Sequence, residues 1–387
     1  MTQSIVVLGP VPVPPCAGIA APLPEQRAIP ATRIESYDIA RAIAVLGMLV
    51  VNYFVIFLEF FEGDSFFMDL ADLLCGRAAA LFIMLAGVGL TLLGRKALDS
   101  GDKEALRLFR KQILMRCLVL YFVGHLLWLY WRADILHFYG LFLFVGALLI
   151  TCSGRVLWLL KLLIITVAAA AYWWTGGDPD LSELFTIQGI VARNVVDLLF
   201  NGSYAAFPWL SFLLVGIWFG KNRMLSGNVS PGRIAFAAAG LFLVSEYLLR
   251  MGRMLDPEEA DTLQSLLLSR TAFPLSPLYA LSCGSSALLL LTVLMVGCRN
   301  ETVCRILSPL KYIGRLSLTI YIGHVFLAYS VFDLLYDNLS GDDYLAAVIA
   351  FFLASCLFFA VFSAVWCKHF AYGPLEWVLR KAAKFQF

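Results

Sequence analysis

Residues 39–61 read IARAIAVLGMLVVNYFVIFLEFF, and Arg41 and Glu59 are the only charged side chains among them. As an α-helix this run would be roughly 35 Å long. The hydrocarbon core of a bilayer is about 30 Å thick. Lipid offers no hydrogen-bond partners to peptide groups, so a spanning segment of this kind must be helical. The run therefore predicts a transmembrane helix.

Further apolar runs follow the first one along the whole chain. Hydrophobic residues make up 61% of the 387 residues, charged residues only 14%, and the mean hydropathy is +0.82. This composition excludes an ordinary soluble protein. We predict an all-α fold, a polytopic membrane helical bundle of about ten transmembrane helices. The predicted spans are 39–61, 73–94, 112–131, 134–152, 154–174, 205–224, 233–252, 276–298, 313–336 and 343–366.

The distribution of Lys and Arg predicts the orientation of these spans. With the N-terminus in the cytoplasm, the cytoplasmic segments hold 22 of the 29 basic residues and the outer loops hold 4. Short cytoplasmic loops of membrane proteins carry an excess of Lys and Arg. The split therefore predicts that both ends of the chain are cytoplasmic.

The two ends of the chain differ in composition from its middle. Residues 1–35 are rich in proline and predict a disordered cytoplasmic tail. Residues 36–387 are expected to form a single transmembrane domain, which closes with GPLEWVLRK at 373–381. That segment predicts an amphipathic helix at the membrane interface. The nine cysteines occur singly and without metal-ligand spacing, so we expect no metal. We also expect no nucleic-acid partner.

The first span begins with a charged pair. Asp38 and Arg41 are three residues apart, so they share a helix face and can form an ion pair. In one interpretation Asp38 caps the helix and Arg41 anchors it at the interface. In the other, the pair forms a cytoplasmic gate or a site for an anionic donor. The sequence leaves both interpretations open.

A second pair lies between the third and fourth predicted spans. Asp134 and His137 are also three residues apart on one face, near the predicted outer surface. A carboxylate beside an imidazole fixes its tautomer and raises its basicity, which suits a general base that deprotonates a hydroxyl or amine. The alternative is an aspartate helix cap followed by an interfacial histidine.

Other polar residues occur within or at the ends of apolar runs. Asn52 lies in the middle of a span and must form a hydrogen bond to another helix. Asp72 and Arg77 begin the second span and can neutralise each other or neighbouring helices. Glu246 and His324 lie inside later spans, where an ionisable residue indicates a functional site unless an interhelical bond accounts for it.

Five stretches of the chain resemble one family of membrane proteins. Residues 33–52, RIESYDIARAIAVLGMLVVN, resemble the R-x-x-x-L-D-x-x-R-G-x-A-x-x-G-M-x-x-x-N start of the YeiB-like bacterial membrane proteins. Those proteins are related to the heparan-alpha-glucosaminide N-acetyltransferases. The other four stretches run in order: LFIMLAGVG at 81–89, DILHFYG at 134–140, GRLSLTIY at 314–321 and GPLEW at 373–377.

The resemblance implies a transmembrane acyltransferase in the bacterial inner membrane. Its co-substrate would be cytoplasmic acyl-CoA, with acetyl-CoA as the first expectation, and its acceptor a small molecule, lipid or glycan. A homodimer is compatible with this prediction. The candidate catalytic residues are His137, Asp134, His324 and Asp72, and the candidate CoA-binding residues are Arg41, Asp38, Arg116 and Arg315.

The chain departs from the family pattern at two places. The heparan acetyltransferases carry a histidine in the outer loop after the first span, whereas residues 62–72 contain Asp72 but no histidine. Ala42 also stands where the family usually has glycine. A catalytic base must therefore come from His137 or His324, or Asp72 and Asp134 act instead.

Two other classes of function remain open from the sequence. A secondary transporter would use Asp72, Arg77, Glu246 and His324 as a substrate or proton path. We find no internal repeat and no matching pair of broken spans, which many transporters have. A membrane protein without catalytic activity that binds a lipid or partner is the third interpretation.

Overall fold

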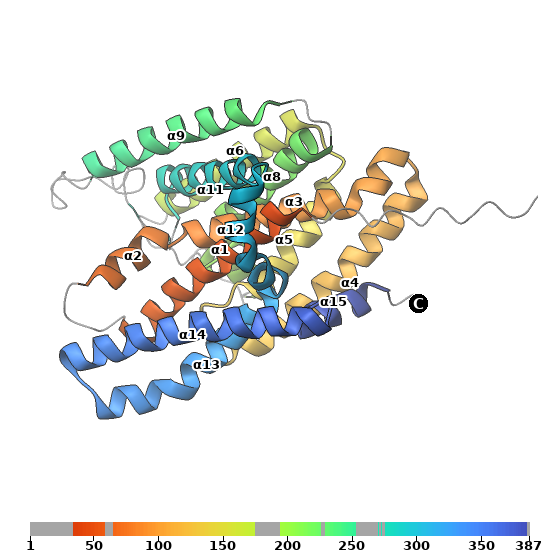
Figure 1. The fold of residues 1–387 in the computed structure, drawn as a ribbon. Helices are drawn as coiled ribbons and strands as arrows, with labels where there is room; N and C mark the ends of the chain where they lie inside the picture. Colours follow the sequence, from red (N-terminus) through yellow and green to blue (C-terminus); the bar gives the residue numbers. More distant parts are fainter. Residues whose placement is uncertain are drawn as a thin grey trace, which may run out of the picture. The chain divides into compact units, whose positions relative to one another are not determined.

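Each predicted apolar run contains a helix in the computed structural model (Figure 1). The structure describes residues 34–58, 65–174, 194–225, 229–252, 270, 272 and 275–384. The described part has no strand beyond an isolated bridge between Ala272 and Leu275. The all-helical fold class is confirmed. Of the tail at 1–35, only the last two residues are described, so the prediction of a disordered tail lies outside the structure.

Figure 1 shows the helices, coloured in chain order. The helical run from Phe66 to Ser100 is broken into α2 and α3. Gly76 has φ +72° and separates α2 from α3, so that Arg77 becomes the first residue of α3. The bounds are α1 Glu35–Tyr53, η1 Phe54–Leu58, α2 Phe66–Leu74, α3 Arg77–Ser100, α4 Lys103–Trp128, α5 Leu136–Leu149, α6 Gly154–Trp174, η2 Asp197–Asn201, α8 Ala206–Phe219, η3 Gly220–Leu225, α9 Pro231–Gly252, α11 Pro277–Gly297, α12 Glu301–Arg315, α13 Ser317–Asn338, α14 Gly341–His369 and α15 Pro374–Lys384.

The number of helices that can cross a membrane is smaller than the number of predicted spans. Among the described residues, seven helices are long and apolar enough, or eight if the bent pair Asn194–Asn201 and Ala206–Asn222 is one span. The difference from ten lies in α4 and α5, and also in α8 when the bent pair is not counted as one span. Helix α4 carries charged residues through its first half, and α5 has only 14 residues, or about 21 Å. The bundle is confirmed, and the orientation remains a prediction.

Helices α1 and α3 form the centre of the unit that spans Glu35–Phe387. Helix α3 packs closely on α8, where a Cβ atom on Gly87 would collide with the Leu213 carbonyl oxygen. A Cβ atom on Gly216 would likewise collide with the Met84 carbonyl oxygen. The small residues at 85–89 thus serve the close helix contact that such residues permit in membranes.

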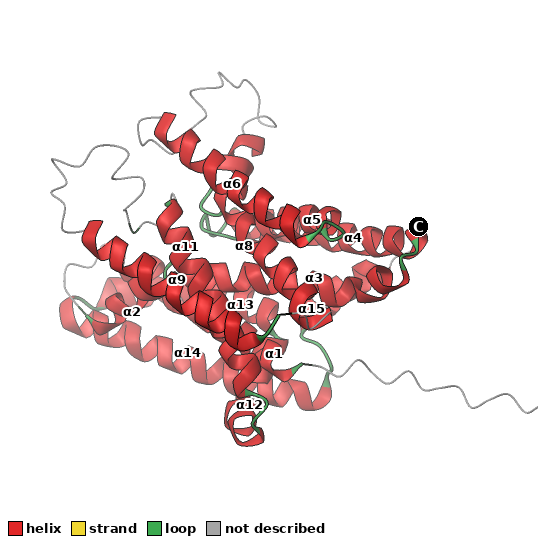
Figure 2. Cartoon of the chain, turned by 90° about the horizontal axis from the view of Figure 1, so that it is seen from above, coloured by secondary structure: helices red, strands yellow, loops and turns green. Residues whose placement is uncertain are grey.

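Helices α6, α9 and α14 lie on the outside of the bundle (Figure 1 and Figure 2). They carry many exposed apolar side chains, as lipid-facing helices do. The amphipathic helix α15 packs against α4 and is held at the start of α13. There the Glu376 carboxylate accepts hydrogen bonds from the backbone N–H groups of Leu318 and Thr319, at 2.8 and 3.2 Å. It also accepts one from the Thr319 hydroxyl at 2.6 Å. A side chain of α15 therefore caps a helix of the bundle.

Candidate active site

Asp134 and His137 lie where the chain enters α5. Asp134 is fully buried, and its carboxylate Oδ2 accepts hydrogen bonds from the backbone N–H groups of Leu136 and His137, at 2.9 and 3.4 Å. Helix α4 approaches this turn closely, since a Cβ atom on Gly124 would collide with the His137 backbone nitrogen. The aspartate is therefore a helix cap, as one interpretation of the sequence expected.

The same carboxylate also orients the histidine. Nδ1 of His137 lies 3.1 Å from Oδ2 of Asp134. An ionised carboxylate only accepts hydrogen bonds, so Nδ1 carries the proton and Nε2 carries the lone pair. The His137 side chain is only 9% exposed. A buried imidazole whose Nε2 is basic and whose Nδ1 is fixed has the arrangement of a general base.

Tyr321 completes this group from α13. Its hydroxyl donates to Oδ1 of Asp134 at 3.3 Å and accepts from the Ile135 N–H at 3.2 Å. The tyrosine is fully buried. No local sequence pattern links Tyr321 to Asp134, because 187 positions separate the two residues. Its position at the end of the GRLSLTIY stretch was the available signal.

His324 has a different environment from His137. Its Nε2 lies 2.9 Å from Nδ2 of Asn52, and its Nδ1 lies 3.3 Å from the Ile320 carbonyl oxygen. A carbonyl oxygen only accepts, so Nδ1 donates to it and Nε2 accepts from the asparagine. The interhelical bond expected of Asn52 is present. Both nitrogens of His324 are occupied, which favours a role in holding α1 to α13.

The Asp38–Arg41 pair forms at the start of α1. The two charged groups are 3.5 Å apart, and the guanidinium of Arg41 lies 4.6 Å from the centre of the Tyr37 ring. Tyr37 itself donates a hydrogen bond to the Leu85 carbonyl oxygen on α3. Asp38 is buried, whereas the Arg41 side chain is 33% exposed. The arginine therefore remains accessible to an anionic ligand.

Aromatic rings connect the Asp134 group with α3, α5 and His324. Phe82 of α3 packs on Tyr139 of α5 with ring centres 5.1 Å apart, and on Tyr321 with ring centres 6.4 Å apart. The Tyr321 ring in turn lies 5.4 Å from the His324 ring. The structure thus brings His137, Asp134 and His324 into one region, with Tyr321 between them.

The other two candidate CoA-binding arginines lie near α15. Arg315 donates from Nη2 to the Ala371 carbonyl oxygen at 2.9 Å. Arg116 lies on α4, close enough to Arg380 of α15 for their charges to interact. The Nε atoms of Arg116 and Arg315 are both buried and have no hydrogen-bond partner among the described residues. Both side chains therefore retain unused donors.

Asp72 is not part of the His137 group. Its side chain is 61% exposed and lies 3.7 Å from Nη1 of Arg270. Burial by itself lowers the pKa of Arg270, but the Asp72 carboxylate and the other nearby groups outweigh it, so that this pKa is raised. Asp72 therefore forms an ion pair with Arg270, away from the Asp134–His137 group.

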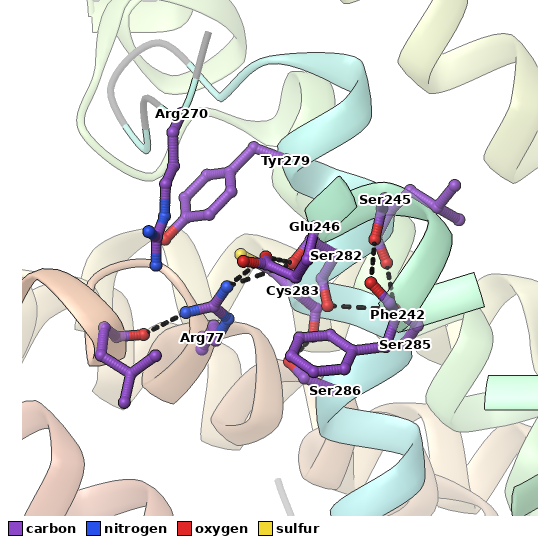
Figure 3. Close-up of polar contacts among 12 residues, drawn as sticks. Arg77, Phe242, Ser245, Glu246, Arg270, Tyr279, Ser282, Cys283, Ser285 and Ser286 are labelled. Atoms are coloured by element: carbon purple, nitrogen blue, oxygen red, sulfur yellow. Dashed lines mark hydrogen bonds and ion pairs between the residues drawn. The ribbon is translucent and has the colours of Figure 1, made fainter. Parts of the chain in front are cut away.

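A partly buried ion pair and a serine join α3, α9 and α11 (Figure 3). Arg77 bonds to Glu246 and, at 3.2 Å, to the Ser282 hydroxyl, and that hydroxyl bonds to the same glutamate. Arg77 also donates to the Leu73 carbonyl oxygen. Of the two outcomes expected for Arg77, neutralisation by a neighbouring helix is the one observed.

Within the described residues, no group of three or more His, Cys, Asp or Glu side chains is placed to hold a metal ion. The chemistry available at the Asp134–His137 group is proton transfer by an imidazole. Tyr321 supplies a hydroxyl to the carboxylate that orients this imidazole. The group therefore suits an acid–base reaction.

Seven or eight apolar helices around a buried polar centre define a multi-pass membrane protein. The family model described as "Heparan-alpha-glucosaminide N-acetyltransferase, catalytic" matches residues 33–254, more than half of the chain. The chain therefore belongs to this family. A second model, described as "Protein of unknown function (DUF418)", matches residues 220–386. The two matches confirm the resemblance to YeiB-like proteins related to the heparan acetyltransferases.

Two relatives from Bacillus are also similar to this chain. The uncharacterized protein YxaH of Bacillus subtilis (strain 168) is 23% identical over 384 residues, which cover 90% of this chain and 94% of YxaH. An uncharacterized 39.9 kDa protein in the amylase 3' region of Bacillus acidopullulyticus is 38% identical over 79 residues. That match covers 20% of this chain and 21% of the relative.

Proposed function

We propose that this protein is a membrane-embedded acyltransferase. It moves an acyl group from cytoplasmic acyl-CoA to a hydroxyl or amine acceptor at or across the membrane. Membership of the heparan-alpha-glucosaminide N-acetyltransferase catalytic family supports acyl transfer. The same family makes acetyl-CoA the first co-substrate to test. The acceptor is a small molecule, lipid or glycan, and the location is the inner membrane of a bacterium.

The Asp134–His137 group carries this proposal. Nε2 of His137 takes the proton from the acceptor O–H or N–H as the acceptor attacks the thioester carbonyl carbon. The bond from the acyl carbon to the acceptor forms, and the bond to the CoA sulfur breaks. The imidazolium then gives its proton to the departing thiolate. Asp134, 3.1 Å from Nδ1, stabilises the positive charge on the ring in between.

The arginines support binding of the CoA phosphates. Arg41 is accessible, and Arg116 and Arg315 place two further guanidinium groups near α15. A guanidinium presents planar donors that match phosphate oxygens. Asp38 acts by orienting Arg41 through its ion pair. His324 and Asp72 take no part in proton transfer in this proposal, because each is committed to another partner.

Acetyl-CoA turnover by the purified full-length protein in nanodiscs tests the proposal. With radiolabelled acetyl-CoA, wild type should release CoA and transfer label to water, lipid or an added acceptor. His137→Ala should lower this rate about a hundredfold, since positioned general bases contribute on the order of 10²–10⁴. No binding and no turnover with several acyl-CoAs would contradict the proposal.

A transporter remains the second candidate, and the Arg77–Glu246–Ser282 cluster favours it. Ionisable side chains that pair between helices are common in substrate and proton paths of membrane proteins, and here Arg77 and Glu246 form a partly buried pair with Ser282 beside it. Substrate accumulation in proteoliposomes that is lost in Glu246→Gln, without any consumption of acyl-CoA, would support transport. Acyl-CoA turnover that survives Glu246→Gln would instead assign the cluster to structural stability.

A further inference from the structure

A groove of about 520 Å³ lies between α4 and α5, at the end where α4 begins. It is lined by four charged residues of α4, and its apolar lining comes from both helices. None of the candidate catalytic or CoA-binding residues takes part in it. The lining residues are Glu104, Arg107, Leu108, Arg110, Lys111, Leu114, Phe144, Ala147 and Leu148.

The groove is positively charged. Three basic side chains face one carboxylate, and Arg107 and Glu104 are 3.9 Å apart at an exposed position. Arg110 is fixed differently, since it donates to the carbonyl oxygens of Ala147 and Leu148 at 3.1 and 3.2 Å. Arg110 thus holds the end of α5, while Arg107 and Lys111 lie one helical turn apart on the same face of α4.

An apolar stripe leads away from the basic groove along α4. Leu114, Leu118, Phe122 and Leu126 follow each other at intervals of four residues, so they lie along one face. They are 40%, 53%, 64% and 53% exposed. Exposed apolar side chains on a helix of a membrane bundle contact lipid tails. The stripe spans roughly 18 Å from Leu114 to Leu126, which is somewhat more than half the thickness of the hydrocarbon core.

The geometry points to a binding site for an anionic phospholipid in this groove. The phosphodiester would lie between Arg107 and Lys111, and the acyl chains would follow the Leu114–Leu126 stripe. Basic side chains next to a bilayer attract anionic headgroups. Leu114 belongs both to the groove lining and to the exposed stripe, whereas neither Asp134 nor His137 lines the groove, so we assign it to a lipid and not to acyl-CoA.

Lipid binding to the purified full-length protein in detergent tests this site. Native mass spectrometry would compare phosphatidylglycerol with phosphatidylcholine of identical acyl chains. The variant is Arg107→Gln/Lys111→Gln, which leaves Arg110 to hold α5. The matched control is Arg95→Gln/Lys96→Gln, which removes two exposed basic residues of α3 outside the groove. A charge-preserving variant, Arg107→Lys/Lys111→Arg, separates loss of charge from loss of folding.

We expect wild type to bind phosphatidylglycerol at least tenfold more tightly than phosphatidylcholine. The Gln double variant should reduce this preference to threefold or less, while the control and the charge-preserving variant retain it. Equal binding of both lipids by wild type would overturn the site, and so would a preference that survives in the Gln variant. Displacement of phosphatidylglycerol by acetyl-CoA would overturn the choice of a lipid.

Discussion

His137 and His324 differ in how their ring nitrogens are used, and this difference separates a candidate base from a structural residue. Nδ1 of His137 is held by Asp134, which leaves Nε2 as the basic nitrogen. Both nitrogens of His324 are committed, one to Asn52 and one to the Ile320 carbonyl oxygen. An imidazole can accept a proton only at a nitrogen with an available lone pair. Proton transfer is therefore proposed for His137 and not for His324.

The partners of Asp134 predict a graded effect on activity. Asp134→Asn should lower acyl transfer about a hundredfold, because a neutral amide no longer stabilises the imidazolium. Tyr321→Phe should cost only about fivefold, since it removes one neutral hydrogen bond to the carboxylate. Steady-state rates measured alongside thermal unfolding would test this order. A larger loss in Tyr321→Phe than in Asp134→Asn, at equal stability, would contradict it.

Asn52 and His324 predict an effect on stability. Asn52→Leu leaves the buried Nε2 of His324 without a donor, and such a group costs about 1–3 kcal/mol. A cycle with Asn52→Leu, His324→Leu and the double variant should show coupling, because the double variant leaves no unpaired partner. Thermal unfolding in detergent is the measurement. Strictly additive effects would show that the bond contributes nothing.

At the scale of elements, close helix contacts depend on glycine at particular positions. Helices α3 and α8 approach so closely that Gly87 and Gly216 have no room for a Cβ atom. The stretch at 81–89 contains Ala86, Gly87 and Gly89, but these small residues do not identify α8 as the partner. Such partners are set by the whole bundle, which a short sequence pattern does not describe.

Gly216→Leu should therefore strongly destabilise the bundle. The added side chain would collide with the Met84 carbonyl oxygen on α3, and overpacking of this kind costs about 1–3 kcal/mol or more. Gly240→Leu is the matched control, because a Cβ atom at Gly240 on α9 meets nothing within 4 Å. Detergent thermostability should fall in the first variant and stay near wild type in the second. Equal stability of both would contradict the contact.

The sequence predicts local pairs well and distant ones poorly. Asp134 with His137 and Asp38 with Arg41 follow from helical spacing, and both form. The partner of Asn52 is 272 positions away, and Tyr321 is 187 positions from Asp134, so no local pattern connects them. Hydropathy also treats 134–152 as one run, whereas the helix extends only from Leu136 to Leu149.

At the scale of the whole molecule, the candidate donor-binding arginine and the proton-transfer group lie at opposite predicted ends of the bundle. Arg41 lies at the predicted cytoplasmic end of α1, and Asp134 lies at the predicted outer end of α4 and α5. Asn52 is eleven residues beyond Arg41, or about 17 Å along the helix. Phe82 contacts both Tyr139 and Tyr321 between these ends. This arrangement agrees with the proposal that acyl-CoA arrives from the cytoplasm and the acyl acceptor from the other side of the membrane.

The predicted orientation can be tested with Cys304 on α12. The hydrogen bond to Glu35 raises the pKa of the Cys304 thiol to about 11, so labelling should increase as the pH rises from 7 to 9. With the other cysteines replaced, a membrane-impermeant maleimide should modify Cys304 at pH 9 in inside-out vesicles only. Ser340→Cys, between α13 and α14, should react in right-side-out vesicles only. The reverse pattern would contradict the orientation.

The rate of acetyl-CoA turnover in three histidine variants tests the central claim most directly. His137→Ala, His324→Ala and His125→Ala would be compared with wild type in the same nanodisc preparation. His125 is the control, since its ring lies 5.1 Å from that of His137 while its Nδ1 lies 3.1 Å from the Tyr121 carbonyl oxygen and not from a carboxylate. We predict that only His137→Ala loses about a hundredfold while it remains folded. Wild-type turnover in a folded His137→Ala variant would contradict the assignment of the base.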